Sequence, residues 1–551
     1  MRQRINRAAR TGWALMLTRG PSQAQFWVLA LLLGIGAGGA AVLFRLGISW
    51  LQATIYGTPD ILTLHTFAAS LAWYWIVLIP VAGGLTVGLL VHHLTPDGRV
   101  RSVQEVIEGA SLYDGRVERR AGLVSAFASL ITLSTGGSSG REGPVVHLAA
   151  ILSSYVAVFI RASGVTGREL LGCAVAAAVS ASFNAPLAGA LFALEVVLRH
   201  YAVHAFAPIA IASVAGAVIS RLTFGDVQEF DLPVQSALGF YVELPAFLIL
   251  GLICGAVAVV FMRAIFWVDD LGSSLQARLR LPGWLRPTVA GLLLGLIATQ
   301  FPHVIGVGYE TTNRALAAEY GFLLAVVFVA VKVAAVAITI GGRMGGGVFS
   351  PSLMVGALTG LAFGSVATAI FPDVSGEGSL YALSGLGAVS ASVLGAPIST
   401  TLIVFELTGD WQAAVAVMAA VSTSVAVSTR LVHRSFFLTS LERRGIHLAA
   451  GPQAWLLGTL KVEEEMRRTE HPRAAPTDAC SKLVADGTYL RLGATLEAAM
   501  PLFEATGAPF IPVVRFPGGD TPPELLGALF QTDALKALNE ALVEMAEEEH
   551  A

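Results

Sequence analysis

The sequence predicts an all-α polytopic membrane protein that carries a small α/β domain at its C-terminal end. Of its 551 residues, 55% are hydrophobic and only 13% are charged, and the mean hydropathy is +0.69. Soluble chains carry about 25% charged residues. The charge is also uneven, because residues 446–551 hold 24 of the 73 charged side chains. The composition therefore divides the chain into a large membrane domain and a small soluble tail.

The net charge also differs between the membrane domain and the tail. Residues 446–551 carry a net charge of −8 within a total of −3, so the membrane domain is mildly positive. A positive membrane domain suits anions, but Lys and Arg that set the topology give the same count. The three cysteines, Cys173, Cys254 and Cys480, are too widely spaced for a metal motif or a disulfide framework. We therefore expect no metal and no other cofactor, and no nucleic-acid partner.

The first apolar run, residues 26–50, is expected to be a retained membrane helix. It is too long for a cleaved signal peptide, and its leader is too extended. Residues 1–22 form a separate N-terminal segment that is rich in arginine. The positive-inside bias predicts that this end of the chain is cytoplasmic. The arginines before the apolar run are Arg2, Arg4, Arg7, Arg10 and Arg19.

The remaining apolar stretches are irregular in length. A straight span needs about 20 apolar residues, but several of these stretches are shorter or are interrupted by Gly or Pro. Short, interrupted segments in matching positions of two halves are typical of transporters with a binding site near the membrane midplane. The stretches lie near residues 24–50, 71–93, 121–134, 143–161, 168–198, 204–222, 240–268, 285–300, 321–341, 350–371, 378–393, 396–408 and 411–432.

The two halves of the membrane domain share sequence landmarks. AVSAS at residues 178–182 recurs at residues 388–392, and each copy is followed by Ala-Pro and then, nine residues after the Pro, by Glu195 or Glu406. GREGP at residues 140–144 has a counterpart, GVFSP, at residues 347–351. The offsets are 207 for the second pair and 210 to 211 for the first. Two landmarks at nearly one offset indicate an internal repeat.

The tail, residues 446–551, reads as two short β–α units. An apolar run with β character, residues 510–514, follows a helix-like pattern. LLGALFQTDALKALNEAL, residues 525–542, then reads as a strand followed by a helix. The pattern predicts a small domain of regulatory type.

Glu142 is the candidate functional carboxylate. It lies in a loop rich in Gly and Ser that leads directly into an apolar helix, and a carboxylate in a membrane is costly enough to suggest a function. GREGP and GVFSP each combine Gly, which permits close approach, with Pro in the first helical turn. Backbone amides at two such helix N-termini can hold a dehydrated anion. Glu142 can mimic that anion and block the site, or it can simply stabilise a helix N-terminus at the surface.

Three motifs together resemble the CLC chloride channel and chloride/proton exchanger family. They are GREGP, GGGVFSPSLMVGA at residues 345–357 and FNAPLAGALFALE at residues 183–195, and the resemblance covers roughly residues 25–445 of a membrane domain expected over residues 23–445. It implies the CLC fold, in which each subunit is built from two inverted repeats of short, tilted helices. It also implies a homodimer with one anion pathway in each subunit. It also implies residue roles: Glu142 as the external gate, the loop residues Gly140, Arg141 and Gly143 around the anion, and backbone amides of Val348 and Phe349 at the central anion.

The first anion motif departs from the family pattern. The usual GSGIPE reads VRSVQE here, at residues 100–105, with Glu105 retained. This pairing puts Arg101 where the anion-coordinating Ser usually lies, whereas a shift of one residue restores Ser102. An Arg at that place can bind anions strongly, extend to the cytoplasm or point away from the site.

Two further departures concern the central site and proton transfer. Phe437 replaces the usual central Tyr and loses its hydroxyl donor, within SFFLTSLERRG at residues 435–445. In exchangers of the family the helix of the FNAPLAGALFALE motif usually ends in a pair of glutamates, and the second one passes protons. Val196 stands at that second place, and the proton-relay position is therefore lost. The resemblance therefore favours a gated chloride channel. The alternative is a proton-coupled chloride antiporter that works without the usual internal glutamate.

The tail resembles a CBS module. Residues 494–541 fit one repeat, while a degenerate first repeat begins at residues 460–466 and is too short to be complete. Structural support or a dimer contact is therefore a better expectation for the tail than a nucleotide site.

Two other classes of protein are alternatives. A membrane-anchored nucleotide sensor would use the CBS-like tail as its output. A membrane enzyme would have only His147, His200 and His204 as tempting ligands, without acidic partners, so we expect no enzyme activity. The expected partners are chloride or another small anion, membrane lipid and a second copy of the chain. We expect a multi-pass protein of the bacterial inner membrane with both termini in the cytoplasm.

Overall fold

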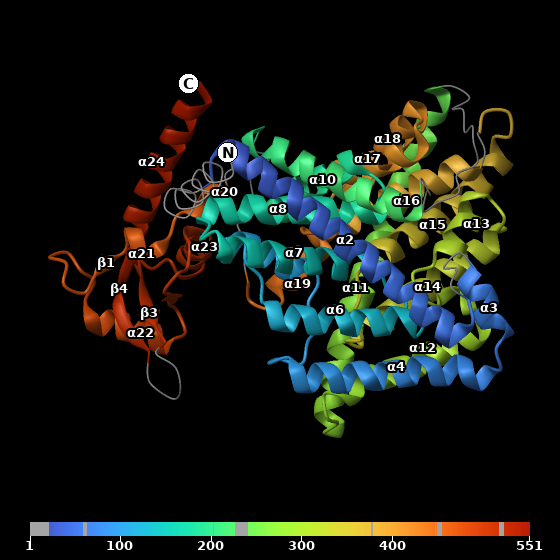
Figure 1. The fold of residues 1–551 in the computed structure, drawn as a ribbon, viewed down its shortest axis with the longest axis horizontal. Coiled ribbons are helices and arrows are strands. Elements are labelled where there is room, and N and C mark those ends of the chain that lie inside the picture. The colour runs from blue at the N-terminus through green and yellow to red at the C-terminus, as the bar shows by residue number, and fades with distance from the viewer. Residues whose placement is uncertain are drawn as a thin grey trace, which may run out of the picture.

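The computed structural model describes residues 21–58, 63–201, 203–225, 241–375, 378–446, 448, 454–516 and 523–550. The N-terminal arginines of residues 1–20 lie outside the described residues. Figure 1 shows a bundle of helices with a small domain, which contains the strands, at one end. The helices α3 and α13 lie at the opposite end of the bundle.

The first half of the membrane domain contains both long and short helices. The irregular lengths agree with the interrupted apolar stretches of the sequence. The elements are α2 (Gln23–Tyr56), α3 (Leu64–Ser70), α4 (Trp73–Leu94), α5 (Val103–Leu112), α6 (Arg119–Ser134), α7 (Glu142–Phe159), α8 (Gly164–Phe183), α9 (Pro186–Phe192), the π-helical turn η2 (Ala193–Leu198) and α10 (Val203–Phe224).

The second half of the membrane domain also contains both long and short helices. Among the described residues of the whole chain, eight helices are long and apolar enough to cross a membrane. The elements of this half are η3 (Tyr241–Glu243), α11 (Leu244–Leu279), α12 (Leu285–Gln300), η4 (Pro302–Val304), α13 (Tyr309–Leu316), α14 (Phe322–Gly341), α15 (Phe349–Ile370), α16 (Gly378–Leu394), α17 (Pro397–Thr408), α18 (Trp411–Val432) and α19 (Phe436–Glu442).

The repeat predicted from the landmarks has a direct structural counterpart. Helix α8 packs against α7 and α10 in the first half, and α16 packs against α15 and α18 in the second. The short helices α9 and α17 contact each other across the two halves. The recurring AVSAS segments lie in α8 and α16, and their small side chains let neighbouring helices approach closely.

The two glutamates of the repeat cap each other's helices. The carboxylate of Glu195 accepts hydrogen bonds from the amides of Ile398 (2.9 Å) and Ser399 (2.8 Å) at the start of α17. The carboxylate of Glu406 accepts hydrogen bonds from the amides of Leu187 (2.9 Å) and Ala188 (2.8 Å) at the start of α9. Each acid therefore satisfies N-terminal amides of the other half, where the helix dipole also favours negative charge.

Neutralising either cap is expected to destabilise the protein. Glu195→Gln and Glu406→Gln should each lower the free energy of unfolding by about 1–2 kcal/mol, because an amide keeps one acceptor oxygen and loses the charge. Thermal unfolding of the purified protein in detergent measures the effect, and Glu319→Gln, at an exposed site, is the control. Equal unfolding temperatures for all three variants would contradict the capping role.

The tail forms its own small core around a four-stranded sheet of order β1-β4-β3-β2. Strand β3 pairs antiparallel with β4 and parallel with β2, and β1 pairs antiparallel with β4. The strand and the strand–helix unit expected from the sequence are present as β3 and as β4 followed by α24. The elements are α20 (Ala454–Thr459), α21 (Val462–Glu465), β1 (Arg467–Arg468), α22 (Thr477–Ala485), β2 (Leu490–Arg491), α23 (Leu496–Thr506), β3 (Phe510–Arg515), β4 (Glu524–Phe530) and α24 (Gln531–His550).

The tail contacts the membrane domain through a buried acid. Glu497 on α23 is buried and forms an ion pair with Arg199, at 3.6 Å between Oε1 and Nη1. Helices α20 and α23 also contact α5, the short helix that begins directly after Ser102. The tail is therefore packed against an element that reaches the candidate site.

Candidate anion site

The two loops of the repeat are hydrogen-bonded to each other. The amide of Gly140 donates to the carbonyl of Gly347 (2.7 Å), and the amide of Gly347 donates to the carbonyl of Gly140 (2.8 Å). This antiparallel bridge brings together the N-termini of α7 and α15, which begin at Glu142 and Phe349. The sequence predicted that both loops face one ion, and the bridge places them side by side.

Glu142 is the first residue of α7, and its carboxylate lies at the N-terminus of α15. Its side chain is 1% exposed, and its carboxylate accepts hydrogen bonds from the Tyr309 hydroxyl (3.1 Å), the Ser350 hydroxyl and the Ser350 amide (3.4 Å). The Arg141 Nε atom is 4.0 Å away. The first amides of α15 have no partner within their own helix and carry partial positive charge. The carboxylate therefore occupies a place that suits a small anion.

Gly143, the residue after Glu142, lies close to Ser102 and Gly347. A Cβ atom on Gly143 would lie 2.4 Å from the Ser102 hydroxyl and 3.2 Å from the Cα atom of Gly347. Glu105 holds the backbone of Ser102, because its carboxylate accepts the Ser102 amide at 2.6 Å. Glu105 is itself paired with Arg444. The start of α5 is therefore fixed where its serine hydroxyl approaches both loops.

Arg101 lies away from this meeting point. Its Nη1 atom pairs with Asp97 at 2.6 Å and its Nη2 atom pairs with Glu118 at 3.0 Å. Its amide donates to the Ser125 hydroxyl at 2.8 Å. The side chain lines a separate cavity that Glu118 and His147 also line. Of the two residues left open by the sequence, Ser102 approaches the loops and Arg101 is held by carboxylates.

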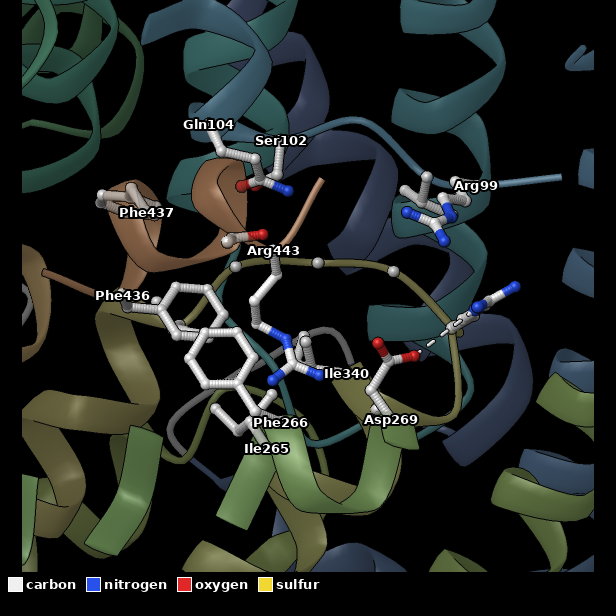
Figure 2. Close-up of a pocket in the computed structure, with 18 of the residues that line it drawn as sticks. Arg99, Ser102, Gln104, Ile265, Phe266, Asp269, Ile340, Phe436, Phe437 and Arg443 are labelled. Carbon is white, nitrogen blue, oxygen red and sulfur yellow. Dashed lines mark ion pairs between the residues drawn. The ribbon is translucent and has the colours of Figure 1, made fainter. Parts of the chain in front are cut away.

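A cavity of about 310 Å³ borders the second loop, the glycine loop of residues 345–348 (Figure 2). In Figure 2, Ser102 and Gln104 lie on one side of the glycine loop, and Ile265 and Phe266 lie on the other. Phe437 also lines this cavity, is buried and packs edge-on against Phe436 with 5.9 Å between ring centroids. The ring expected at this position is therefore present as an apolar wall without a hydroxyl donor.

Most charged groups of this cavity are paired. Arg343 lies 3.6 Å from Asp269, Arg443 pairs with Asp270, and Arg444 pairs with Glu105. Arg99 also lines the cavity. Within the part of the chain that the structure describes, no carboxylate lies within ion-pair distance of the Arg99 side chain. Its guanidinium is the group best placed to attract an anion into the cavity.

Removing the Arg99 charge is expected to slow anion entry. Arg99→Gln should lower the initial rate of anion flux several-fold at low ionic strength, and the difference should shrink in high salt because the attraction is screened. Arg99→Lys should retain most of the rate. Arg278→Gln, at an exposed site outside the cavity, is the control. Flux from Arg99→Gln that equals the control at low salt would contradict this role.

The other predicted residues pack around the loops. Val348 is the last residue before α15 and lines the cavity. Phe349 packs on Phe183 and Phe192, with ring centroids 4.7 and 5.8 Å apart. Arg141 is buried, donates to the Ser182 carbonyl at 3.3 Å and lies over the Tyr309 ring at 5.2 Å.

Val196 lies in the π-helical turn η2 and is buried. A valine there offers no titratable group. The neighbouring Glu195 is fully used as the cap of α17. At this turn the chain therefore has no spare carboxylate to carry a proton.

Sequence reasoning missed Tyr309, Ser350 and Arg99. Ser350 lies inside the GVFSP motif, so its hydroxyl could have been considered as a donor. Tyr309 follows a glycine turn and begins α13, but nothing in the local pattern relates it to a residue 167 positions earlier. Only the fold brings its hydroxyl to Glu142.

The fold and the site define a class of protein: a membrane transport protein in which two helix N-termini meet at one carboxylate. The family model described as "Voltage gated chloride channel" matches residues 83–429. This is more than half of the chain, and the chain belongs to that family, the CLC family. The prediction of the family from the sequence is confirmed, and the chain is not an enzyme.

Two curated relatives illustrate the range of the family. A ClcB-like protein of Ralstonia nicotianae is 30% identical over 419 residues, which are 75% of this chain and 96% of the relative. The H(+)/Cl(-) exchange transporter ClcA of Cronobacter sakazakii is 29% identical over 405 residues, covering 72% of this chain and 85% of the relative. CLC-type chloride transport by a multi-pass membrane protein therefore holds for this chain.

Solved structures agree on the fold. A slow cyanobacterial Cl⁻/H⁺ antiporter matches with a TM-score of 0.66 and 20% identity, over 76% of this chain and 97% of that one. A eukaryotic CLC transporter matches with a TM-score of 0.62 and 20% identity, over 94% of this chain and 88% of that one. At this identity the likeness concerns the fold alone. The predicted fold class, a helical CLC membrane domain with a small C-terminal α/β domain, is confirmed.

Proposed function

We propose that this protein is a gated chloride channel in which Glu142 is the gate. The observation that carries the proposal is the position of the Glu142 carboxylate, which is held by Tyr309 and Ser350 at the N-terminus of α15. A carboxylate there excludes a chloride ion from the backbone amides at the start of α15. Protonation or displacement of the side chain opens the pathway.

The proposed route begins in the cavity beside the glycine loops. Arg99 attracts the anion, and the Ser102 hydroxyl with the backbone amides of Val348 and Phe349 holds it after dehydration. Phe437 lines this position without donating a hydrogen bond. Uncharged donors suit transport, because a full positive charge in contact with the ion would hold it too tightly to release.

The second position of the route is the place that Glu142 now fills. Gly140 borders it, because a Cβ atom there would lie 2.6 Å from Glu142 Oε2, and the Arg141 Nε atom lies 4.0 Å from Glu142 Oε1. Gly143 follows Glu142 in α7. Arg101 takes no part in this route and instead stabilises the loop before α5 through Asp97 and Glu118.

The channel mode is supported by Val196. A proton that reached Glu142 would need a second carrier toward the other side of the membrane, and η2 offers none at this position. The alternative, a proton-coupled chloride antiporter, is supported by the relative named an H(+)/Cl(-) exchange transporter.

Three expectations complete the proposal. The membrane domain, residues 23–445, forms a homodimer in a bacterial inner membrane, in contact with lipid, and both termini lie in the cytoplasm. The tail, residues 446–551, is CBS-like and stabilises the membrane domain through contacts such as Glu497 with Arg199. It binds no nucleotide.

Proton movement during chloride efflux tests the channel mode. Proteoliposomes loaded with chloride are placed in a weakly buffered, chloride-poor medium, and a potassium ionophore starts the efflux. We expect chloride to leave while the external pH stays at the level of protein-free liposomes. Proton uptake in a fixed ratio to chloride would favour the antiporter, and absence of chloride efflux would contradict the anion pathway itself.

A further inference from the structure

The gate carboxylate has two side-chain hydroxyls as direct partners. The Tyr309 hydroxyl donates to Glu142 Oε1 at 3.1 Å and lies 3.3 Å from the Ser350 hydroxyl, which bonds to the same oxygen. All three side chains are at most 2% exposed. Three segments, α7, α13 and α15, therefore meet in one small hydrogen-bonded cluster. Water has little access to this cluster, so these bonds are stronger than the same bonds at the surface.

We propose that Tyr309 is a latch, a residue whose hydroxyl holds Glu142 in the blocking position and so sets the pH at which the pathway opens. This inference rests on the proposed role of Glu142 as the gate. A hydrogen bond donated to a carboxylate stabilises its charged form. The latch therefore favours the charged, blocking state over the protonated, released state.

The latch is rigidly mounted. Tyr309 is the first residue of α13, and the next residue, Glu310, anchors that helix to α3. The Glu310 carboxylate accepts the amides of His65 (3.0 Å) and Thr66 (3.3 Å) and pairs with Arg314 at 3.1 Å. Because these bonds fix the start of α13, the Tyr309 ring has little freedom to follow Glu142 when the carboxylate leaves.

A second anchor holds the turn before the latch. Lys332 on α14 is fully buried, and its ammonium group donates to the carbonyls of Gly306 (3.2 Å) and Val304 (3.4 Å). The chain then turns through Gly308, whose φ of 98° favours glycine, directly before Tyr309. Lys332 therefore holds the turn before Tyr309, and Glu310 holds the helix α13 after it.

One charged group near the cluster also stabilises the charged gate. Arg141 forms a buried ion pair with Glu142, with 4.0 Å between Nε and Oε1, and stacks over the Tyr309 ring, and Tyr309→Phe leaves this pair in place. Lys332 is bonded to the turn, and Arg314 is engaged with Glu310. Burial would raise the pKa of Glu310, but hydrogen bonds from His65 and Thr66 hold that pKa below its usual range. Glu310 therefore stays charged at mildly acidic pH, and the anchor persists while the gate opens.

The test is the pH dependence of chloride flux from Tyr309→Phe. This variant keeps the ring under Arg141 and removes only the hydroxyl. We expect the midpoint of the flux–pH curve to move upward by about one pH unit, which corresponds to about 1.4 kcal/mol. At pH values above the wild-type midpoint, flux should be about tenfold higher than in the wild type. Maximal flux at low pH should stay unchanged. Ser350→Ala should shift the midpoint in the same direction.

Tyr381→Phe is the matched control, because Tyr381 is also buried and its hydroxyl makes a hydrogen bond, to Ser375 at 3.0 Å in another part of the fold. It should leave the midpoint unchanged. Tyr309→Phe combined with Glu142→Gln should behave like Glu142→Gln alone, because the latch then has no charged partner. Gel filtration of each variant identifies any loss of folding.

The outcomes separate the latch from the gate. If Glu142→Gln raises flux but Tyr309→Phe and Ser350→Ala both keep the wild-type midpoint, the latch is wrong and the gate stands. If Tyr309→Phe only lowers flux at every pH, its hydroxyl is structural and the latch is also wrong. If Glu142→Gln itself leaves flux and its pH response unchanged, the proposed gate fails first.

Discussion

Glu142→Gln is expected to raise chloride flux at neutral pH by about tenfold or more and to flatten its pH dependence. The neutral amide no longer competes with chloride for the donors at the start of α15, and it cannot be protonated. Hydrogen bonds to charged groups are worth about 1.5–3 kcal/mol each, and about 1.4 kcal/mol corresponds to a factor of ten. Loss of the charge at one such bond is therefore enough for this change.

Chloride efflux from proteoliposomes between pH 5 and pH 8 measures the effect. Glu142→Ala should give the same direction, since it removes the blocking group altogether. Glu319→Gln, an exposed acid on a loop, controls for the loss of one negative charge. Unchanged flux and an unchanged pH response in both Glu142 variants would exclude the gating role.

Gly143→Ala is expected to reduce chloride flux by at least about tenfold. Its new methyl group would lie 2.4 Å from the Ser102 hydroxyl and 3.2 Å from the Cα atom of Gly347. The 2.4 Å contact displaces the Ser102 hydroxyl, and the 3.2 Å contact shifts the Gly347 backbone by a few tenths of an ångström. Since the bridge between Gly140 and Gly347 positions both helix N-termini, a shift of either loop changes the distances at the proposed anion route.

A control variant makes this result specific. Gly39→Ala places a methyl group in α2 where nothing lies within 4 Å, and it should leave flux unchanged. Normal flux from Gly143→Ala alone would contradict the close meeting of Ser102 and Gly143.

Sequence motifs predicted the fold class and the two loops because both depend on local features. Gly for close approach, Pro in a first turn and the repeat of AVSAS can be read along the chain. The exact register at α5 could not be read in this way. Arg101 and Ser102 are adjacent, and the side chain that approaches the loops depends on where α5 begins and on Glu105, which holds the Ser102 amide.

Other features depend on contacts between distant parts of the chain. Glu195 and Glu406 could be recognised as equivalent, but their exchange of partners across the two halves requires α9 and α17 to lie side by side. Tyr309 reaches Glu142 only because α13 packs beside α15. Arg99 differs from its neighbours in charge pairing, which becomes visible only when Asp269, Asp270 and Glu105 are placed.

The central claim is that Glu142 gates a chloride pathway that does not move protons. The reversal potential across a membrane with crossed chloride and proton gradients tests it most directly, in the wild type and in Glu142→Gln. Both potentials are expected to follow the chloride gradient alone and to stay unchanged when the proton gradient is reversed. A wild-type reversal potential that shifts with the proton gradient would exclude a channel and identify a proton-coupled antiporter.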